Sequence, residues 1–129
     1  MTIAIKDENF SGSIIQEINL YFQQENVTVR DIITQRVIHE VENYNQKLPE
    51  YFNGLVEPSD AEKTINGFKL TTRKMIDAEK QVYVALDAFT KNGYFLLIDT
   101  IQSESLEQEV FLKSTTSISF IKLTPLVGG

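Results

Sequence analysis

The stretch that decides the fold runs from residue 14 to residue 44 and reads IIQEINLYFQQENVTVRDIITQRVIHEVENY. Its first part alternates between apolar and polar residues, as a half-buried strand does. One face is apolar apart from Gln16, and the other face is mixed. The apolar face holds Ile14, Ile18, Leu20 and Phe22, and the mixed face holds Ile15, Glu17, Asn19 and Tyr21.

From Thr28 onward the hydrophobic period changes to that of a helix. Thr28 is suited to be the N-cap, and Asp31 favours the positive end of the helix dipole. Polar residues such as His39 and Glu40 fall between the members of an apolar stripe. The stripe consists of Val29, Ile32, Ile33, Val37, Val41 and Tyr44. We therefore predict a helix that packs this stripe on the even-numbered face of the preceding strand.

The N-terminal residues predict a partner for that strand. Ile3 and Ile5 share one face of a short strand, which we expect to end at the polar stretch 6–9. The Ser11-Gly12-Ser13 connection then favours an antiparallel hairpin with the second strand.

Residues 45–93 contain two predicted helices. Pro49, Pro58 and two Asn-Gly pairs interrupt the first half, where a capping box at 59–62 predicts a short helix ending at Asn66-Gly67. A better helix begins at Ala78 after the N-cap Asp77 and is closed by Asn92-Gly93. Its apolar stripe is Val82, Ala85, Leu86 and Phe89.

The last section of the chain returns to strands. Tyr94–Ile98 is an apolar run typical of a buried strand, and residues 109–112 predict a short one. Residues 117–123 alternate again, with Ile118 and Phe120 on one face and Ile121 and Leu123 on the other. Pro125 ends this strand, and residues 124–129 are predicted to form a flexible C-terminal tail.

Composition narrows the class of protein. The chain has 129 residues, 42% of them hydrophobic, which suits one domain with its own core. Eighteen acidic and twelve basic residues give a net charge of −6 at pH 7, which argues against a nucleic-acid or anionic-membrane surface. The absence of cysteine excludes disulfides, thiolate zinc sites and cysteine nucleophiles.

No catalytic motif stands out in the sequence. His39 is the only histidine and has no cysteine or second histidine to join it. The acidic residues Glu104, Glu107 and Glu109 lack a metal-binding pattern and suit a solvated face. The longest apolar run, Tyr94–Ile98, is too short to span a membrane. We expect a cytoplasmic protein that is not an enzyme and has no cofactor or metal of its own.

The order of a hairpin, a helix and further strands resembles the β-grasp fold of the ubiquitin-like superfamily, and most closely its sulfur-carrier branch. Thr28-Val29-Arg30-Asp31-Ile32-Ile33 looks like the segment that starts the helix in the small carriers of thiamin and molybdopterin biosynthesis. Residues 106–120 look like their leucine, short strand, polar turn and last strand. Pro125-Leu126-Val127-Gly128-Gly129 is similar to their closing segment. The matched regions, 1–44 and 94–129, cover about 80 of 129 residues.

The resemblance implies an α+β fold with a mixed sheet, one main helix and a helical insertion at about 45–93, all in one domain. It also implies that the Gly129 carboxylate is adenylated with ATP and magnesium by a partner related to the ubiquitin-activating enzyme. Gly128 and Gly129 suit a narrow channel because they lack side chains. Leu126 and Val127 would then contact the channel, and Pro125 would stiffen the base of the tail.

The fate of the activated carboxylate stays open between three hypotheses. Because of the insertion, this chain resembles a bacterial ubiquitin-like modifier more than an ordinary sulfur carrier. We therefore favour conjugation to a target amine, with conjugating and deconjugating enzymes as partners. The alternatives are a sulfur carrier with a C-terminal thiocarboxylate and a β-grasp interaction module that is never conjugated. Because ubiquitin-like proteins resemble one another in using the outer sheet face, we predict partner contacts there, unless the inserted helices cover it. The predicted contact residues are Ile15, Tyr21, Ile121 and Leu123.

Overall fold

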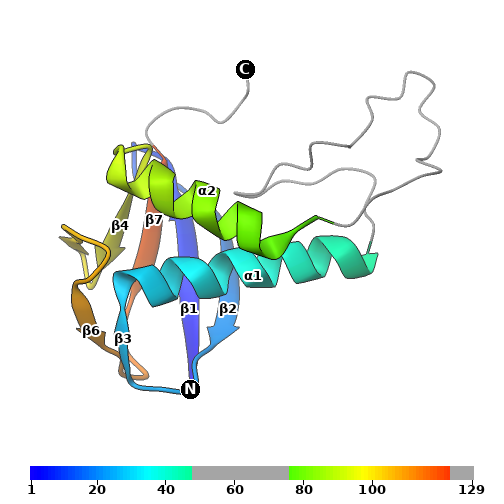
Figure 1. Cartoon of the computed structure of the whole chain (residues 1–129). Coiled ribbons are helices and arrows are strands. Elements are labelled where there is room, and N and C mark those ends of the chain that lie inside the picture. The colour runs from blue at the N-terminus through cyan, green and yellow to red at the C-terminus, as the bar shows by residue number, and fades with distance from the viewer. Residues whose placement is uncertain (48–75, 123–129) are drawn as a thin grey trace.

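The protein folds into two layers, a mixed β-sheet and two helices that lie on one face of it (Figure 1). The computed structural model describes residues 1–47 and 76–122. In chain order the elements are β1 (Thr2–Glu8), β2 (Ile14–Tyr21), β3 (Asn26–Thr28), α1 (Val29–Lys47), α2 (Ala78–Thr90), β4 (Tyr94–Ile98), β5 (Ile101–Gln102), β6 (Glu109–Phe111) and β7 (Ile118–Lys122). The predicted α+β class is confirmed.

The five-stranded sheet has the order β2-β1-β7-β4-β5. β1 pairs antiparallel with β2 and parallel with β7, while β4 pairs antiparallel with both β7 and β5. The first and last strands of the described residues, β1 and β7, therefore lie side by side, and β2 forms the edge of the sheet next to β1. β3 and β6 form a separate antiparallel ribbon.

The first strand is longer than predicted. The expectation that it ends at the polar stretch after Ile5 is wrong, because β1 continues to Glu8 with β2 and β7 paired on its two sides. Asp7 keeps the inward phase of Ile3 and Ile5 and is only 2% exposed. Its carboxylate is accommodated in the interior because Arg36 binds it.

A β-bulge changes the side to which one predicted core residue belongs. Asp7 pairs with Gln16 but Glu8 pairs with Ile14, so Ile15 has no cross-strand partner. The shift places Ile14 on the outer side of the sheet opposite Glu8, and 56% of its surface is exposed. Its predicted place on the inner apolar face is therefore wrong.

Helix α1 forms as its sequence predicts. The backbone N–H of Asp31 donates to Thr28 Oγ1 at 3.2 Å, and the backbone N–H of Thr28 donates to Asp31 Oδ2 at 2.9 Å. These reciprocal bonds satisfy two donors at the start of the helix. All six members of the predicted stripe, from Val29 to Tyr44, are buried.

Helix α2 also begins and ends where the sequence predicts. Asp77 caps it by accepting a hydrogen bond from the backbone of Glu79 at 3.1 Å. At the other end Asn92 has a φ of 61°, and the N–H of Gly93 donates to the carbonyl of Ala88 at 2.8 Å. This is a Schellman ending with asparagine in the left-handed position. The shorter helix predicted near residues 59–66 lies outside the described residues.

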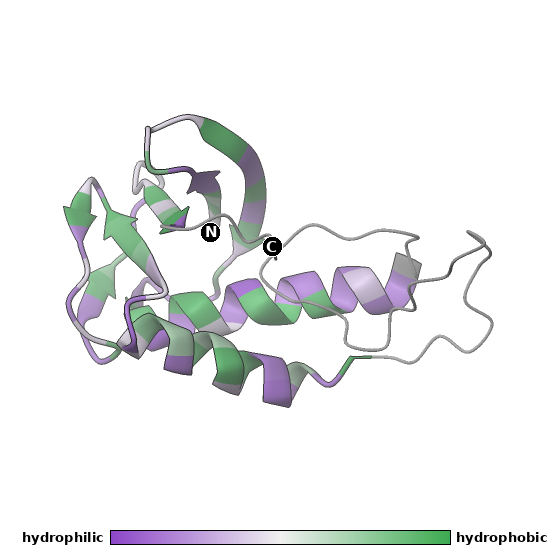
Figure 2. Cartoon of the chain, turned by 90° about the horizontal axis from the view of Figure 1, so that it is seen from above, coloured by the Kyte–Doolittle hydropathy of each residue, from purple (hydrophilic) through white to green (hydrophobic). Residues whose placement is uncertain are grey.

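Both helices cover the same face of the sheet, which Figure 1 and Figure 2 show from two directions. α2 lies beside α1 and reaches the sheet through Phe89, whose ring centroid is 6.1 Å from that of Tyr94. Tyr94 in turn lies 5.8 Å from Phe120, a core residue of β7. α2 therefore covers the inner face, and the outer face is left to other contacts. Within the described ranges, neither helix is long and apolar enough to cross a membrane.

The predicted strands after α2 are confirmed with small shifts. The apolar run at 94–98 is β4, residues 109–111 form β6, and β7 occupies 118–122. Ile118 and Phe120 are fully buried on the inner face, as predicted. Two of the three shortest strands, β3 and β5, are not predicted by the sequence pattern.

Candidate functional site

One end of the sheet carries an exposed apolar surface, at the point where β7 ends. Strand pairing aligns Ile14, Glu8, Ile121 and Phe95 across four neighbouring strands on the outer face. Ile14 is 56% exposed, and Ile121 and Phe95 are half-buried. Ile15 in the bulge and Phe10 in the β1–β2 turn are exposed at the same end. We call Phe10, Ile14, Ile15, Phe95 and Ile121 the end-of-sheet surface.

The structure brings two of the predicted partner-contact residues to this end and separates a third. Ile15 and Ile121 belong to the end-of-sheet surface. Tyr21 is 64% exposed, but it pairs with Thr2 at the opposite end of β2. Tyr21 lies six positions along the strand from Ile15, a distance of about 20 Å. The four residues therefore do not make one surface.

The remaining predicted site residues lie outside the described residues. These are Leu123, Pro125, Leu126, Val127, Gly128 and Gly129.

The middle of the outer face is more polar than its end. The next aligned row contains Glu17, Lys6, Ser119 and Leu97. Ser119 donates its hydroxyl hydrogen to Glu8 Oε2 at 2.7 Å, which joins β7 to β1 on this face. An apolar partner surface would therefore find its contacts at the end of the sheet rather than over its centre.

A buried ionic cluster lies behind this end, on the inner face. The Arg36 guanidinium is fully buried and bonds to both carboxylate oxygens of Asp7, with 2.7 Å between Nη2 and Oδ2. Its Nε and Nη2 also donate to Glu40 Oε2, at 3.0 and 2.7 Å. The Arg36 Cζ atom lies 4.7 Å from the centroid of the Phe120 ring. The cluster therefore joins β1, α1 and β7.

The cluster changes the acidity of its members. Burial alone would raise the pKa of Asp7, but the hydrogen bonds and charge of Arg36, with a further bond from Gln16, hold that pKa below its usual value. Burial alone would lower the pKa of Arg36, but the carboxylates of Asp7 and Glu40 outweigh this effect and raise that pKa above its usual value. At Lys122, the last residue of β7, burial dominates and lowers the pKa of the amine.

Sequence reasoning missed this cluster. Glu40 was assigned to the polar side of the helix, and that assignment is wrong, because only 7% of its surface is exposed. Arg36 lies beside the stripe residue Val37 and is covered completely. Two signals were available: Asp7 continues the alternation of Ile3 and Ile5, and Arg36 and Glu40 are one helical turn apart.

The described part of the chain contains no cluster of side chains suited to bind a metal ion. Within residues 1–47 and 76–122, no three histidine, aspartate or glutamate side chains gather in a way that could hold an ion.

Comparison of the chain with models of protein families, with curated proteins and with solved structures finds no match.

Proposed function

We propose that this chain is a ubiquitin-like protein of β-grasp fold whose Gly129 carboxylate is adenylated by a ubiquitin-activating-enzyme-like partner and then joined to a target amine. The observation that carries the proposal is the strand order β2-β1-β7-β4-β5. In this order β1, the first strand of the initial hairpin, pairs in parallel with β7, and the helices lie on one face of the sheet. This order agrees with the β-grasp arrangement that the sequence resembles. On this reading α2 is an addition that widens the helical layer.

The position of β7 supports a role for the segment after it. β7 is an inner strand of the sheet and ends at Lys122, so the chain continues from the end-of-sheet surface toward Gly128-Gly129. A partner that holds the diglycine would thus meet the exposed Ile14 and Ile15 nearby. We assign docking of the activating partner to this surface, because exposed apolar groups gain most from burial in an interface.

The chemistry requires a free carboxylate at Gly129. One carboxylate oxygen attacks the α-phosphorus of magnesium-bound ATP, which forms the acyl-adenylate and releases pyrophosphate. A thiol of a partner then attacks the carbonyl carbon, and AMP leaves. The target amine displaces that thiol and an amide bond forms. The chain has no cysteine, so this thiol belongs to a partner.

Intact-mass measurement separates this function from its alternatives. The chain is incubated with its cognate adenylyltransferase, ATP, magnesium and a sulfur donor, or with conjugating enzyme and target instead of the donor. A branched peptide joining Gly129 to a lysine supports the proposal. A stable thiocarboxylate without conjugates would assign the chain as a sulfur carrier. Failure of both with an active partner would leave an interaction module.

A further inference from the structure

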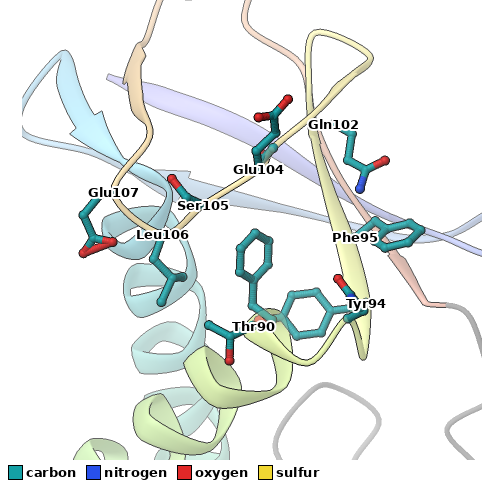
Figure 3. Close-up of a pocket in the computed structure, with 11 residues that line it drawn as sticks. Thr90, Tyr94, Phe95, Gln102, Glu104, Ser105, Leu106 and Glu107 are labelled. Carbon is teal, nitrogen blue, oxygen red and sulfur yellow. The ribbon is translucent and has the colours of Figure 1, made fainter.

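A cavity of about 520 Å³ lies between the C-terminal end of α2 and the connection from β5 to β6 (Figure 3), and it shares only Phe95 with the end-of-sheet surface. Its volume falls within the range of sites that bind small molecules or side chains of a partner. It borders β5, the edge strand of the sheet.

The floor of the cavity is aromatic. Phe89 and Tyr94 contribute rings tilted by 58° with centroids 6.1 Å apart, and Leu106 adds an aliphatic wall. The Tyr94 hydroxyl already donates to the carbonyl of Ala85 at 2.8 Å. Burial also raises the pKa of Tyr94, so this ring stays neutral. Phe89 and Tyr94 are 8% and 4% exposed, so the floor offers the accessible part of each ring rather than a free hydroxyl.

Ser103 lines the cavity with a hydroxyl that has no partner. Ser103 is 4% exposed. Its backbone N–H donates to the carbonyl of Leu96 at 2.9 Å, and this bond fixes Ser103 beside β4. Among the described residues, Ser103 Oγ is the only buried side-chain polar atom without a hydrogen-bond partner. Buried polar atoms are nearly always paired, so Ser103 Oγ is a hydrogen-bonding group that a bound molecule can use.

The rim of the cavity is acidic. Glu104 and Glu107 both line it, and its lining contains no lysine or arginine among the described residues. Glu107 is bound by Arg30 at 2.8 Å across an exposed ion pair, while the side chain of Glu104 is exposed beside the opening. The net charge of −6 adds a general attraction for basic partners.

We propose that this cavity binds an arginine side chain of a partner protein. A guanidinium has flat faces that stack on aromatic rings and five N–H donors in its plane. The floor supplies the rings, and Ser103 Oγ and the glutamate carboxylates supply acceptors. The proposal does not depend on the chemistry of Gly129, because the residues that carry it belong to α2, β4 and the β5–β6 connection.

The test is an NMR titration of the ¹⁵N-labelled protein with N-acetyl-arginine amide and with its neutral analogue N-acetyl-citrulline amide. We expect the amide signals of residues 103–107 and Phe89 to shift in a saturable way with the arginine probe. The citrulline probe should bind about fivefold more weakly, because it loses the charge-assisted hydrogen bonds. Shifts elsewhere, equal affinity for the two probes, or no shift at roughly 20 mM probe would overturn the proposal.

Variants then assign the contacts. Glu104→Gln should weaken arginine binding about threefold, whereas Glu109→Gln, an equal charge change on β6 outside the cavity lining, should leave it within error. Ser103→Ala should weaken binding by about threefold without lowering the melting temperature, since it removes a hydroxyl that has no partner in the free protein. A Ser103→Ala protein that melts earlier and binds normally would show that the hydroxyl is structural.

Discussion

At the scale of single residues, Arg36 is the costliest group to place in this core. It is fully buried, and two carboxylates share its charge while Phe120 lies against it. Desolvation opposes such a cluster, and good hydrogen-bond geometry compensates for it. The cluster is therefore sensitive to loss of one partner, because the remaining charges would stay buried.

Replacement of the guanidinium tests this sensitivity. Arg36→Met should lower the free energy of unfolding by about 3–5 kcal/mol, because it leaves Asp7 and Glu40 buried without their common partner. Arg30→Met removes the exposed pair with Glu107 and should cost less than about 1 kcal/mol. Urea unfolding of both variants gives the comparison. Equal losses would contradict the assigned role of burial.

The depressed pKa of Asp7 predicts a loss of stability in acid. Its ordinary value is 3.8, and the native state holds it lower, so near and below that pH the unfolded chain binds more protons. The stabilisation is complete above the unfolded value and is lost as the pH falls through the folded one. The gap in unfolding free energy between wild type and Asp7→Asn should therefore narrow from pH 7 toward pH 2. A constant gap would exclude this linkage.

The sequence predicts residues whose partners are local and misses those whose partners are distant. Thr28 and Asp77 accept hydrogen bonds from backbone groups three and two positions away, and both are N-caps as predicted. Asp7 and Arg36 are 29 positions apart, so neither residue alone indicates that the other will neutralise it.

At the scale of elements, length decides what the sequence can predict. α1 and α2 have several turns each, and their hydrophobic period is clear. β5 has two residues and β3 has three, of which only Val27 is apolar; β6 is as short as β3, but Val110 and Phe111 continue into Leu112 as an apolar run. The bulge at Ile15 depends on how β1 aligns with β2, which the alternation within β2 does not specify.

The end of α2 offers a test at this scale. Asn92 holds a left-handed conformation with a φ of 61°, which glycine adopts freely and alanine does not. Asn92→Ala should destabilise the protein by about 1 kcal/mol, whereas Asn92→Gly should be neutral or slightly stabilising. Thermal unfolding of the two variants distinguishes backbone strain from loss of the side chain. Equal destabilisation by both would assign the effect to the amide group.

At the scale of the whole molecule, alternation predicts the face of a residue outside the β-bulge, but it does not predict the residue's row in the sheet. Ile15, Tyr21 and Ile121 are all accessible or half-buried on the outer side as expected. Their positions along the sheet follow from the pairing of β1 with β7 across more than a hundred residues of sequence. The sequence therefore groups Tyr21 with residues at the other end of the sheet, and the bulge hides the outward position of Ile14.

This distinction gives a paired test of the docking surface. Ile14→Ser should slow activation by the adenylyltransferase about tenfold, since it removes an apolar contact beside the end of β7. Tyr21→Ser changes an equally exposed residue at the far end and should slow it less than about twofold. Pyrophosphate exchange measures both rates. Equal effects of the two substitutions, or a stronger effect at Tyr21, would show that the activating partner does not dock on the end-of-sheet surface.

The most direct measurement is chemical capture of the activated terminus. The protein is incubated with its cognate adenylyltransferase, magnesium, ATP and hydroxylamine, and its intact mass and C-terminal peptide are measured. A hydroxamate on Gly129 that requires ATP, and that is absent from a variant lacking Gly129 but folded as stably as wild type, is the predicted result. A positive control shows that the enzyme adenylates a known carrier protein under the same conditions. If Gly129 then keeps an unmodified carboxylate, the proposed function is contradicted.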